Sequence, residues 1–372
     1  MDDDHDLYEI IVQLGGMSLS GTGHKATPFL RRLARRYRDT RPELASALVG
    51  LLRDTPLRAA PSAGGTLSRP VDNESRLQLV REEDAVVLDH EPILREDILA
   101  LLSQLASEHE RPSRLLDAGL APTRTALFVG PPGVGKTLAA RWLARSLNRP
   151  LIVLDLASVM SSLLGRTGEN VRRVLDYAKQ TPCVLLLDEL DAVAKRRDDT
   201  SEIGELKRLV TVLLQEIDMW PEGGLLIAAT NHSDLLDPAV WRRFELVVEF
   251  PLPDGEGLAR AIREFLEDDV AAEAIVQPLG VAYRGMSFSD VEREIMKARR
   301  TAAMQDIPVE QLLLTMASNR FRLLPTSDRV QVAAELMQGG GISQRRTHEI
   351  TGLSRDTLRK YATDPQRPPR RT

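Results

Sequence analysis

Five short apolar runs mark the middle of the chain, and amphipathic stretches separate them. The runs are continuous rather than alternating, which is typical of strands buried on both faces of a parallel sheet. The amphipathic segments between them fit crossover helices, so the pattern predicts an α/β fold with a parallel five-stranded sheet. The runs are Ala126–Val129, Leu151–Leu154, Val184–Leu187, Leu225–Ala228 and Leu246–Val248.

The pattern changes on both sides of this core. After Pro253 the strand signal stops, and charged segments with helical periodicity predict a helical lid. Leu30–Leu52 predicts a helical N-terminal domain, whose interleaved arginines fit a solvated helix face or a nucleic-acid surface. A stretch rich in Pro, Gly, Ala and Ser predicts a flexible linker. The predicted divisions are 1–54 (N-terminal domain), 55–75 (linker), 76–253 (α/β core), 254–324 (lid) and 325–372 (C-terminal module).

Composition excludes several classes of protein. The 372 residues carry 49 basic and 54 acidic side chains, a net charge of -5, so the global field singles out neither nucleic acid nor membrane. The single cysteine, Cys183, lies in an apolar run, which fits a small buried hydrophobe and allows no disulfide within the chain. The N-terminus is acidic and no apolar stretch is long enough to span a membrane. These features predict a cytoplasmic protein with no membrane partner.

The strongest chemical motif follows the first predicted strand and precedes a helix. It matches the phosphate-binding pattern G-x-x-x-x-G-K-[ST], in which glycines let backbone N–H groups wrap a phosphate chain. Lys136 is expected to reach the β- and γ-phosphates, and Thr137 to hold Mg²⁺ through its hydroxyl. The motif predicts ATP and Mg²⁺ as cofactors. Its residues are Gly130, Pro131, Pro132, Gly133, Val134, Gly135, Lys136 and Thr137.

Two carboxylates end the third apolar run. Asp188 and Glu189 follow Val184–Leu187 directly, a costly place for charge unless a cation or a reaction requires it. Asp188 suits Mg²⁺, and Glu189 suits a general base that polarises the attacking water. A solvated helix cap is the alternative reading of the pair. Asp191 is expected only to cap or charge the following turn.

With these motifs in place, the stretch from Leu127 to Phe250 resembles the ATPase module of AAA-family proteins, within the AAA+ superfamily. The resemblance is carried by the phosphate loop, the acid pair and the segment Ala229–Ala239. In that family the Asn after the fourth strand, here Asn231, positions the lytic water between the γ-phosphate and the catalytic Glu. Taken alone, Asn231 would more often be a turn residue.

The resemblance also implies assembly. In the family, an arginine near Trp241–Phe244 projects into the neighbouring subunit's ATP site, where a guanidinium stabilises charge on the transferred phosphoryl group. Arg243 is the first choice here. Arg242 is directly adjacent to Arg243, whereas the family often spaces its two arginines with Pro-Gly. The implied assembly is a homo-oligomeric ring, a hexamer.

Two further segments resemble family features more weakly. Gly285–Asp290 is similar to a segment that starts a lid helix near the nucleotide, with Ser289 in place of a second-sensor arginine; helix capping by Ser287 or Ser289 explains the same residues. Leu163, Leu164 and Gly165 lie where the family places a substrate-gripping pore loop, although the aromatic position is Leu163 and an ordinary helix end fits equally. The basic run 195–197 fits a second pore loop or a solvated turn.

The C-terminal module resembles a helix-turn-helix of transposases and resolvases. Ser343 and Ser354 fit N-caps, and Gly352 supplies the turn. From residue 341 onward, eight basic side chains outnumber three acidic ones, unlike the rest of the chain. A small helical hairpin also serves as a protein-docking module, so both readings stay open. The candidate DNA-binding residues are Arg355, Thr357, Arg359 and Lys360.

Two functions follow from these features. In the first, a ring-shaped AAA+ ATPase remodels or delivers a protein partner; Gly119–Pro122, leading into the first strand, resembles small bacterial ATPases associated with subtilisin-like proteases, as in defence-type systems. In the second, a DNA-bound AAA+ ATPase controls transposition, transcription or defence. The chain carries no hydrolase constellation of its own, so any proteolysis would come from a partner.

Overall fold

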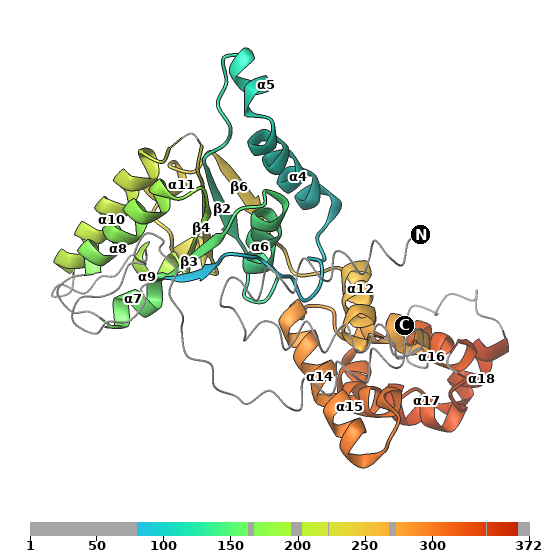
Figure 1. Ribbon diagram of the computed structural model, residues 1–372. Helices are drawn as coiled ribbons and strands as arrows, with labels where there is room; N and C mark the ends of the chain where they lie inside the picture. Colours follow the sequence, from blue (N-terminus) through green and yellow to red (C-terminus); the bar gives the residue numbers. More distant parts are fainter. Residues whose placement is uncertain are drawn as a thin grey trace, which may run out of the picture.

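The computed structural model describes residues 80–162, 167–194, 203–221, 223–267, 273–339 and 341–363 (Figure 1). The N-terminal domain and linker predicted before residue 76 lie outside these ranges. The candidate pore residues Leu163, Leu164 and Gly165, and the basic run 195–197, lie outside them as well.

A six-stranded mixed sheet forms the first half of the described chain. The strand order is β1-β3-β4-β5-β2-β6, and all five predicted runs are present as mutually parallel strands. The prediction of a five-stranded parallel sheet was incomplete, because β1 adds an antiparallel edge beside β3. The strands are β1 (Arg81–Glu83), β2 (Thr125–Val129), β3 (Leu151–Asp155), β4 (Val184–Asp188), β5 (Leu225–Thr230) and β6 (Leu246–Glu249).

The edge strand β1 has no apolar pattern because charge pairing, rather than hydrophobic burial, attaches it. Its Glu83 is 3% exposed, and its carboxylate accepts hydrogen bonds from Arg141 on α6 and from Arg81, each at 2.8 Å. A buried carboxylate is tolerated only when it is paired in this way. A three-residue strand of charged side chains is therefore invisible to a search for apolar runs.

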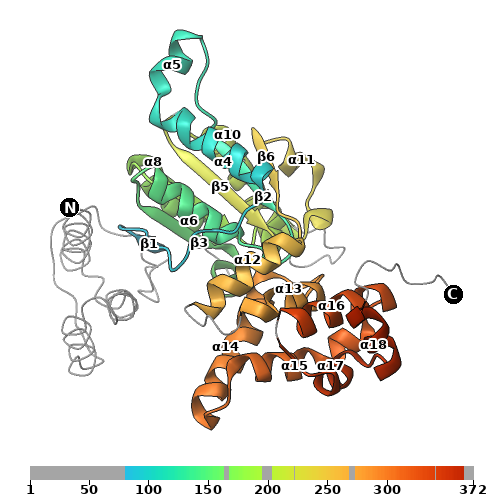
Figure 2. The same ribbon diagram turned by 90° about the vertical axis from the view of Figure 1, so that its right-hand side faces the viewer.

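Helices cover both faces of the sheet, as the continuous apolar runs predict (Figures 1 and 2). Along β2, Leu127 and Val129 join the core on one side, while Ala126 and Phe128 join the core on the other. The alternation follows from the two-residue period of a strand. The first core is closed by α8 (Thr167–Gln180) and α10 (Ile203–Asp218), and the second by α4 (Glu96–Glu110) and α6 (Lys136–Ser146).

Shorter elements complete this half. Most of them connect consecutive strands. The helix α5 instead extends away from the sheet, at the end opposite the helical half (Figure 1). They are α5 (Pro112–Asp117), α7 (Leu156–Ser162), α9 (Asp191–Ala194), the 3₁₀ helix η1 (Ser233–Leu235) and α11 (Pro238–Trp241).

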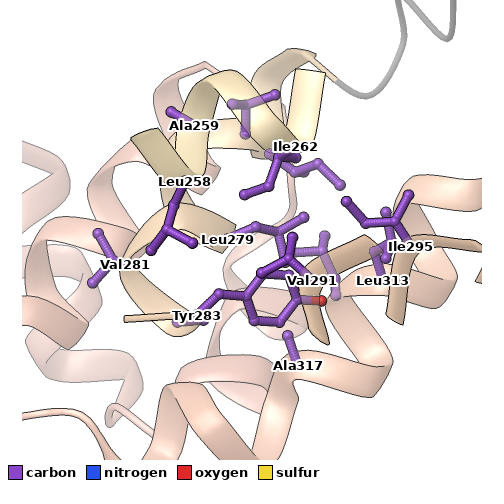
Figure 3. Packing of buried hydrophobic residues seen from close by; sticks show 14 of the residues in the cluster. Leu258, Ala259, Ile262, Leu279, Val281, Tyr283, Val291, Ile295, Leu313 and Ala317 are labelled. Carbon is purple, nitrogen blue, oxygen red and sulfur yellow. The ribbon is translucent and has the colours of Figure 1, made fainter. Parts of the chain in front are cut away.

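The second half is helical, as predicted beyond Pro253. Its core is a cluster of buried aliphatic side chains around Tyr283 (Figure 3). Tyr283 is 1% exposed, and this burial raises the pKa of its hydroxyl. The helices of the predicted lid are α12 (Gly255–Leu266), α13 (Glu273–Ala282), α14 (Phe288–Gln305) and α15 (Val309–Leu323).

The C-terminal helices share this core rather than forming a separate one. Val332, Leu336 and Ile350 belong to the same buried cluster as the lid side chains, so the packing is continuous across Pro325. A small cluster of Ala333, Leu353 and Leu358 joins the last helix to it. The helices are α16 (Thr326–Gln338), α17 (Gln344–Thr351) and α18 (Arg355–Thr363), seen side by side in Figure 2.

Candidate nucleotide site

At two positions, the loop between β2 and α6 lies too close to neighbouring atoms for any residue but glycine. A Cβ at Gly130 would lie 2.1 Å from the Phe250 carbonyl oxygen, and one at Gly133 would lie 2.6 Å from Ser287 Oγ. Gly133 also has a φ of 76°, which side-chain-bearing residues rarely adopt. The loop therefore lies between the end of β6 and the start of α14 in the lid, and it leads directly into α6.

Lys136 lies at the centre of the site. Its ammonium donates to the carbonyls of Gly130 (2.7 Å) and Pro131 (2.9 Å) and to Asn231 Oδ1 (2.8 Å). The side chain is 6% exposed, and its desolvation lowers the pKa of the ammonium to about 8, while nearby carboxylates oppose the shift. The predicted phosphate-binding lysine and the predicted sensor Asn231 are therefore in direct contact.

Hydroxyl and carboxylate oxygens come together beside Lys136. The Thr137 hydroxyl donates to Asp188 Oδ2 at 3.1 Å, and Asp188 Oδ1 accepts from the Glu189 N–H at 3.0 Å. Such hard oxygen ligands fit Mg²⁺, which in phosphate sites takes one or two protein ligands and completes its shell with phosphate and water. Among the described residues, no group of three or more His, Cys, Asp or Glu could hold a metal ion.

Glu189 follows β4 in a strained conformation. Its φ is 57°, a region that favours glycine, and its side chain lines the cavity. Partial burial raises the pKa of its carboxyl, and the carboxylates of Asp155, Asp188 and Asp191 act in the same direction. A raised pKa makes the group a better proton acceptor, as a general base requires.

The site is a cavity of about 450 Å³ between the sheet and the lid. The lid touches the loop directly, because the Ser289 N–H donates to the Gly133 carbonyl at 3.2 Å. Ser287 caps α14 by accepting from the Asp290 N–H at 3.3 Å, and Ser289 lines the cavity. Several other residues that line the cavity could not be predicted from the sequence, because they lie far apart in the chain and belong to no motif: His90, Ile93, Leu94, Arg141, Phe265 and Glu292.

Two of these side chains also touch each other across the cavity. His90, from the segment before α4, packs edge-on against Phe265 of α12 with ring centroids 5.7 Å apart. The contact links the segment that follows β1 to the lid.

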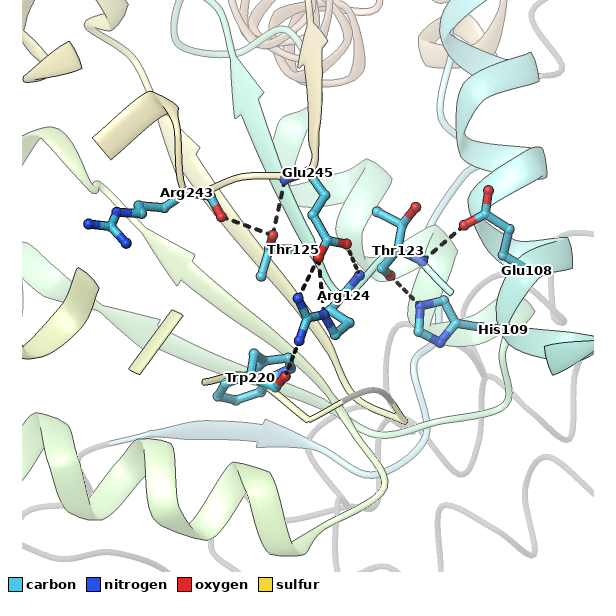
Figure 4. Close-up of polar contacts among 8 residues, drawn as sticks. All are labelled: Glu108, His109, Thr123, Arg124, Thr125, Trp220, Arg243 and Glu245. Carbon is cyan, nitrogen blue, oxygen red and sulfur yellow. Dashed lines mark hydrogen bonds and ion pairs between the residues drawn. The ribbon is translucent and has the colours of Figure 1, made fainter. Parts of the chain in front are cut away.

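Arg242 and Arg243 are exposed, and neither lines the cavity of its own chain. The Arg243 guanidinium pairs with Asp218 at the end of α10, which raises its pKa further. Its carbonyl accepts from the Thr125 hydroxyl at 3.2 Å, next to the Arg124–Glu245 pair (Figure 4). The arginines are thus held at the starts of β2 and β6, the opposite ends of these strands from the phosphate loop.

The candidate DNA-binding residues lie on α18. Arg355, Arg359 and Lys360 are exposed, while Leu358 is buried. Thr357 is half-buried and its hydroxyl lies 2.8 Å from Ser354 Oγ, the cap of the helix, so it contributes to the turn.

Comparison with known proteins agrees with this geometry. Residues 126–252 match the model of the ATPase family associated with various cellular activities (AAA). Over this range the chain is similar to AAA-family ATPase domains. The matched range runs from β2 to the end of β6 and includes the loop, the acid pair and Asn231.

Curated proteins similar to this chain include bacterial and archaeal proteins. An uncharacterized AAA family ATPase, y4kL, from Sinorhizobium fredii is 40% identical over 199 residues, 53% of this chain and 60% of that protein. A proteasome-activating nucleotidase from Methanopyrus kandleri is 30% identical over 247 residues, 64% of this chain and 57% of that protein. Proteasome-activating nucleotidase 1 of Haloferax volcanii is 31% identical over 198 residues, 51% and 49% of the two proteins. The chain thus spans between half and three fifths of these relatives.

No helix among the described residues has both the length and the apolar character needed to cross a membrane.

Replacing Lys136 by Met should change the pH dependence of stability in one direction. The folded-state ammonium has a pKa of about 8, whereas a lysine in an unfolded chain titrates near about 10.4. Between these values the unfolded state binds more protons, so the wild type should gain stability relative to Lys136→Met as the pH rises from about 8 to about 10. Urea unfolding at a series of pH values measures this difference. A difference that stays flat or falls would contradict a desolvated ammonium.

Proposed function

We propose that this chain is an ATPase that works as a homo-oligomeric ring and couples ATP hydrolysis to remodelling or delivery of a protein partner. The observation that carries the proposal is the convergence of Lys136, the Thr137–Asp188 pair and Asn231 in one cavity with Glu189. The glycine loop and the start of α6 would bind the phosphates, as backbone N–H groups at a helix N-terminus do. Thr137 and Asp188 would hold Mg²⁺, which neutralises phosphate charge when bound.

Within this proposal each side chain has a separate task. Lys136 would exchange its loop carbonyls for phosphate oxygens, Glu189 would accept a proton from the attacking water, and Asn231 would orient that water. The raised pKa of Glu189 and the Lys136–Asn231 contact support these roles.

Glu189→Gln should separate nucleotide binding from turnover. The amide keeps the shape of the side chain but accepts no proton, so ATP affinity should be retained while kcat falls by about a hundred- to ten-thousand-fold. Lys136→Ala should instead weaken ATP binding, because it removes the buried cation. Isothermal titration and phosphate-release assays measure the two effects. Equal turnover by wild type and Glu189→Gln would exclude Glu189 as the general base.

The ring is supported by where the arginines lie. Arg243 and Arg242 are exposed at a distance from their own cavity, as expected of groups that complete the site of an adjacent subunit. In such an assembly the Arg243 guanidinium must leave Asp218. Exposed ion pairs contribute little free energy, so breaking this pair costs little. A hexamer is the ring that the family resemblance implies.

Mixing two inactive variants tests catalysis in trans. Arg243→Ala lacks the arginine and Lys136→Ala lacks the nucleotide site, so mixed rings should contain some interfaces with both groups intact and regain part of the turnover. Asp218→Ala is the matched control, since it frees Arg243 without removing it and should keep turnover. Mass photometry would establish that the rings are mixed. Mixed rings without recovery would contradict a shared site at Arg243, and the same mixture with Arg242→Ala tests the adjacent arginine.

A protein partner is supported by the names of two relatives, which are proteasome-activating nucleotidases. The sequence resemblance to small ATPases associated with subtilisin-like proteases adds a second kind of protease partner, in a bacterial defence-type system. Leu163, Leu164 and Gly165 would then contact polypeptide. Stimulation of turnover by an unfolded polypeptide would favour this branch.

A second candidate function is a DNA-bound ATPase. It is favoured by the arrangement of α17 and α18, joined by a three-residue turn with Gly352 at a φ of 68°. Leu353 and Leu358 anchor the turn and α18 to α16, leaving the basic side chains of α18 outward. This is the arrangement in which a second helix can enter a major groove.

Substitutions on α18 test DNA binding better than truncation, because α16 and α17 share the core of the lid. Arg359→Ala should weaken binding to duplex DNA and shallow the log–log salt slope by about 0.9. Arg355→Ala, nearer the helix N-terminus, should weaken binding by about 1–3 kcal/mol on the preferred sequence. Arg300→Ala on α14 is the charge-matched control. Fluorescence anisotropy that shows no binding at moderate salt, or equal slopes for all variants, would identify the module as a protein-docking element.

A further inference from the structure

The loop after β4 is tied to the end of β5 beyond the last pair of the strand ladder. The Leu190 N–H donates to the Ala229 carbonyl at 2.9 Å. Asp191 Oδ1 accepts from the Thr230 hydroxyl at 2.9 Å and from the Asn231 N–H at 3.2 Å. The turn that carries Glu189 and the turn that carries Asn231 are therefore joined by one carboxylate oxygen.

Thr230 makes this junction rigid. The residue is 1% exposed, and its hydroxyl donates to Asp191 while accepting from the His232 N–H at 3.1 Å. Both the donor and an acceptor position of a buried hydroxyl are thus used, as buried polar groups require. The backbone is fixed on both sides of Asn231, through its own N–H and through that of the next residue.

The side chain of Asn231 projects from this fixed backbone to the Lys136 ammonium, 2.8 Å from its Oδ1. Asp191 itself does not line the cavity. Its hydrogen bonds therefore act on the site through the residues that it holds, while its charge also acts on Glu189 and Lys136 without contact.

We propose that Asp191 is a positioning residue that sets the location of Asn231 relative to Glu189 and Lys136 during ATP hydrolysis. The inference rests on the proposed function and goes beyond it, because the sequence assigns Asp191 only a cap. Asp191 supplies a charged acceptor to two donors, which makes both hydrogen bonds stronger than neutral ones. Loss of that acceptor leaves the Leu190–Ala229 bond between the two turns but removes the bond that reaches Asn231 itself.

Substitution of Asp191 should lower turnover without lowering nucleotide affinity. A displacement of about 1 Å in a positioning group can reduce the rate about a hundred-fold, so Asp191→Ala should reduce kcat by about ten- to a hundred-fold. The Kd values for ATP and ADP should stay at the wild-type values, because Asp191 does not line the nucleotide cavity. Asp191→Asn retains one oxygen acceptor and should recover part of the rate.

Thr230 provides a matched pair of variants. Thr230→Ser keeps the buried hydroxyl and should keep kcat, whereas Thr230→Val has nearly the same shape without the hydroxyl and should lose rate as Asp191→Ala does. Ser343→Ala on α17 removes a helix cap of similar kind far from the cavity and controls for a general loss of stability. If Asp191→Ala does not fold, the Thr230 pair and Asp191→Asn carry the test.

A double-mutant cycle with Asn231→Ala decides whether the effect passes through Asn231. If Asp191 acts by positioning Asn231, adding Asp191→Ala to Asn231→Ala should change kcat little. Independent, multiplying losses would overturn the inference, as would a wild-type kcat in Asp191→Ala. The kcat of each variant is compared with that of assembled wild-type protein that hydrolyses ATP. A wild type that binds ATP but never hydrolyses it would overturn the proposed function, and the inference with it.

Discussion

The three hydrogen bonds of the Lys136 ammonium hold together the parts of the molecule on which its chemistry depends. They join the phosphate loop after β2 to the turn after β5, two segments almost a hundred residues apart in the chain. A buried ammonium is stable only with such partners, and even so its pKa falls to about 8. Phosphate oxygens can replace the loop carbonyls as acceptors. The burial that lowers the pKa of Lys136 therefore also favours binding of an anionic ligand beside it.

The parallel sheet explains why these groups meet. β2, β4 and β5 are neighbours or near neighbours, and all three run in the same direction. The loop, the acid pair and Asn231 each follow one of these strands, so their carboxyl ends bring the groups to one edge. The sequence predicted the five parallel strands and the phosphate loop because apolar runs and glycine spacing are local signals, whereas Asn231 was singled out only by the family resemblance.

The parts that the sequence did not predict depend on tertiary contacts. β1 was missed because its attachment comes from the buried Glu83–Arg141 pair rather than from an apolar pattern. Phe265 and His90 gave no signal because they line the cavity from segments about 175 positions apart. The bonds of Asp191 were not foreseen either, since a carboxylate after an acid pair reads as a simple cap. The partner of Arg243 likewise depends on how α10 lies against the sheet.

Continuity of the helical core gives the C-terminal helices a consequence for the nucleotide site. α14 touches the phosphate loop through Ser289, and the cluster that fixes α14 also contains side chains of α16 and α17. A ligand that shifts α16 or α17 would therefore also displace the lid, because close-packed side chains transmit displacement. DNA or protein bound at the C-terminal helices would in this way bias the lid that closes the cavity, and nucleotide would bias those helices in return. Such reciprocity follows from linkage, so a docking module that shares the core of the lid would be coupled to the nucleotide site, whereas a module on a flexible tether would not.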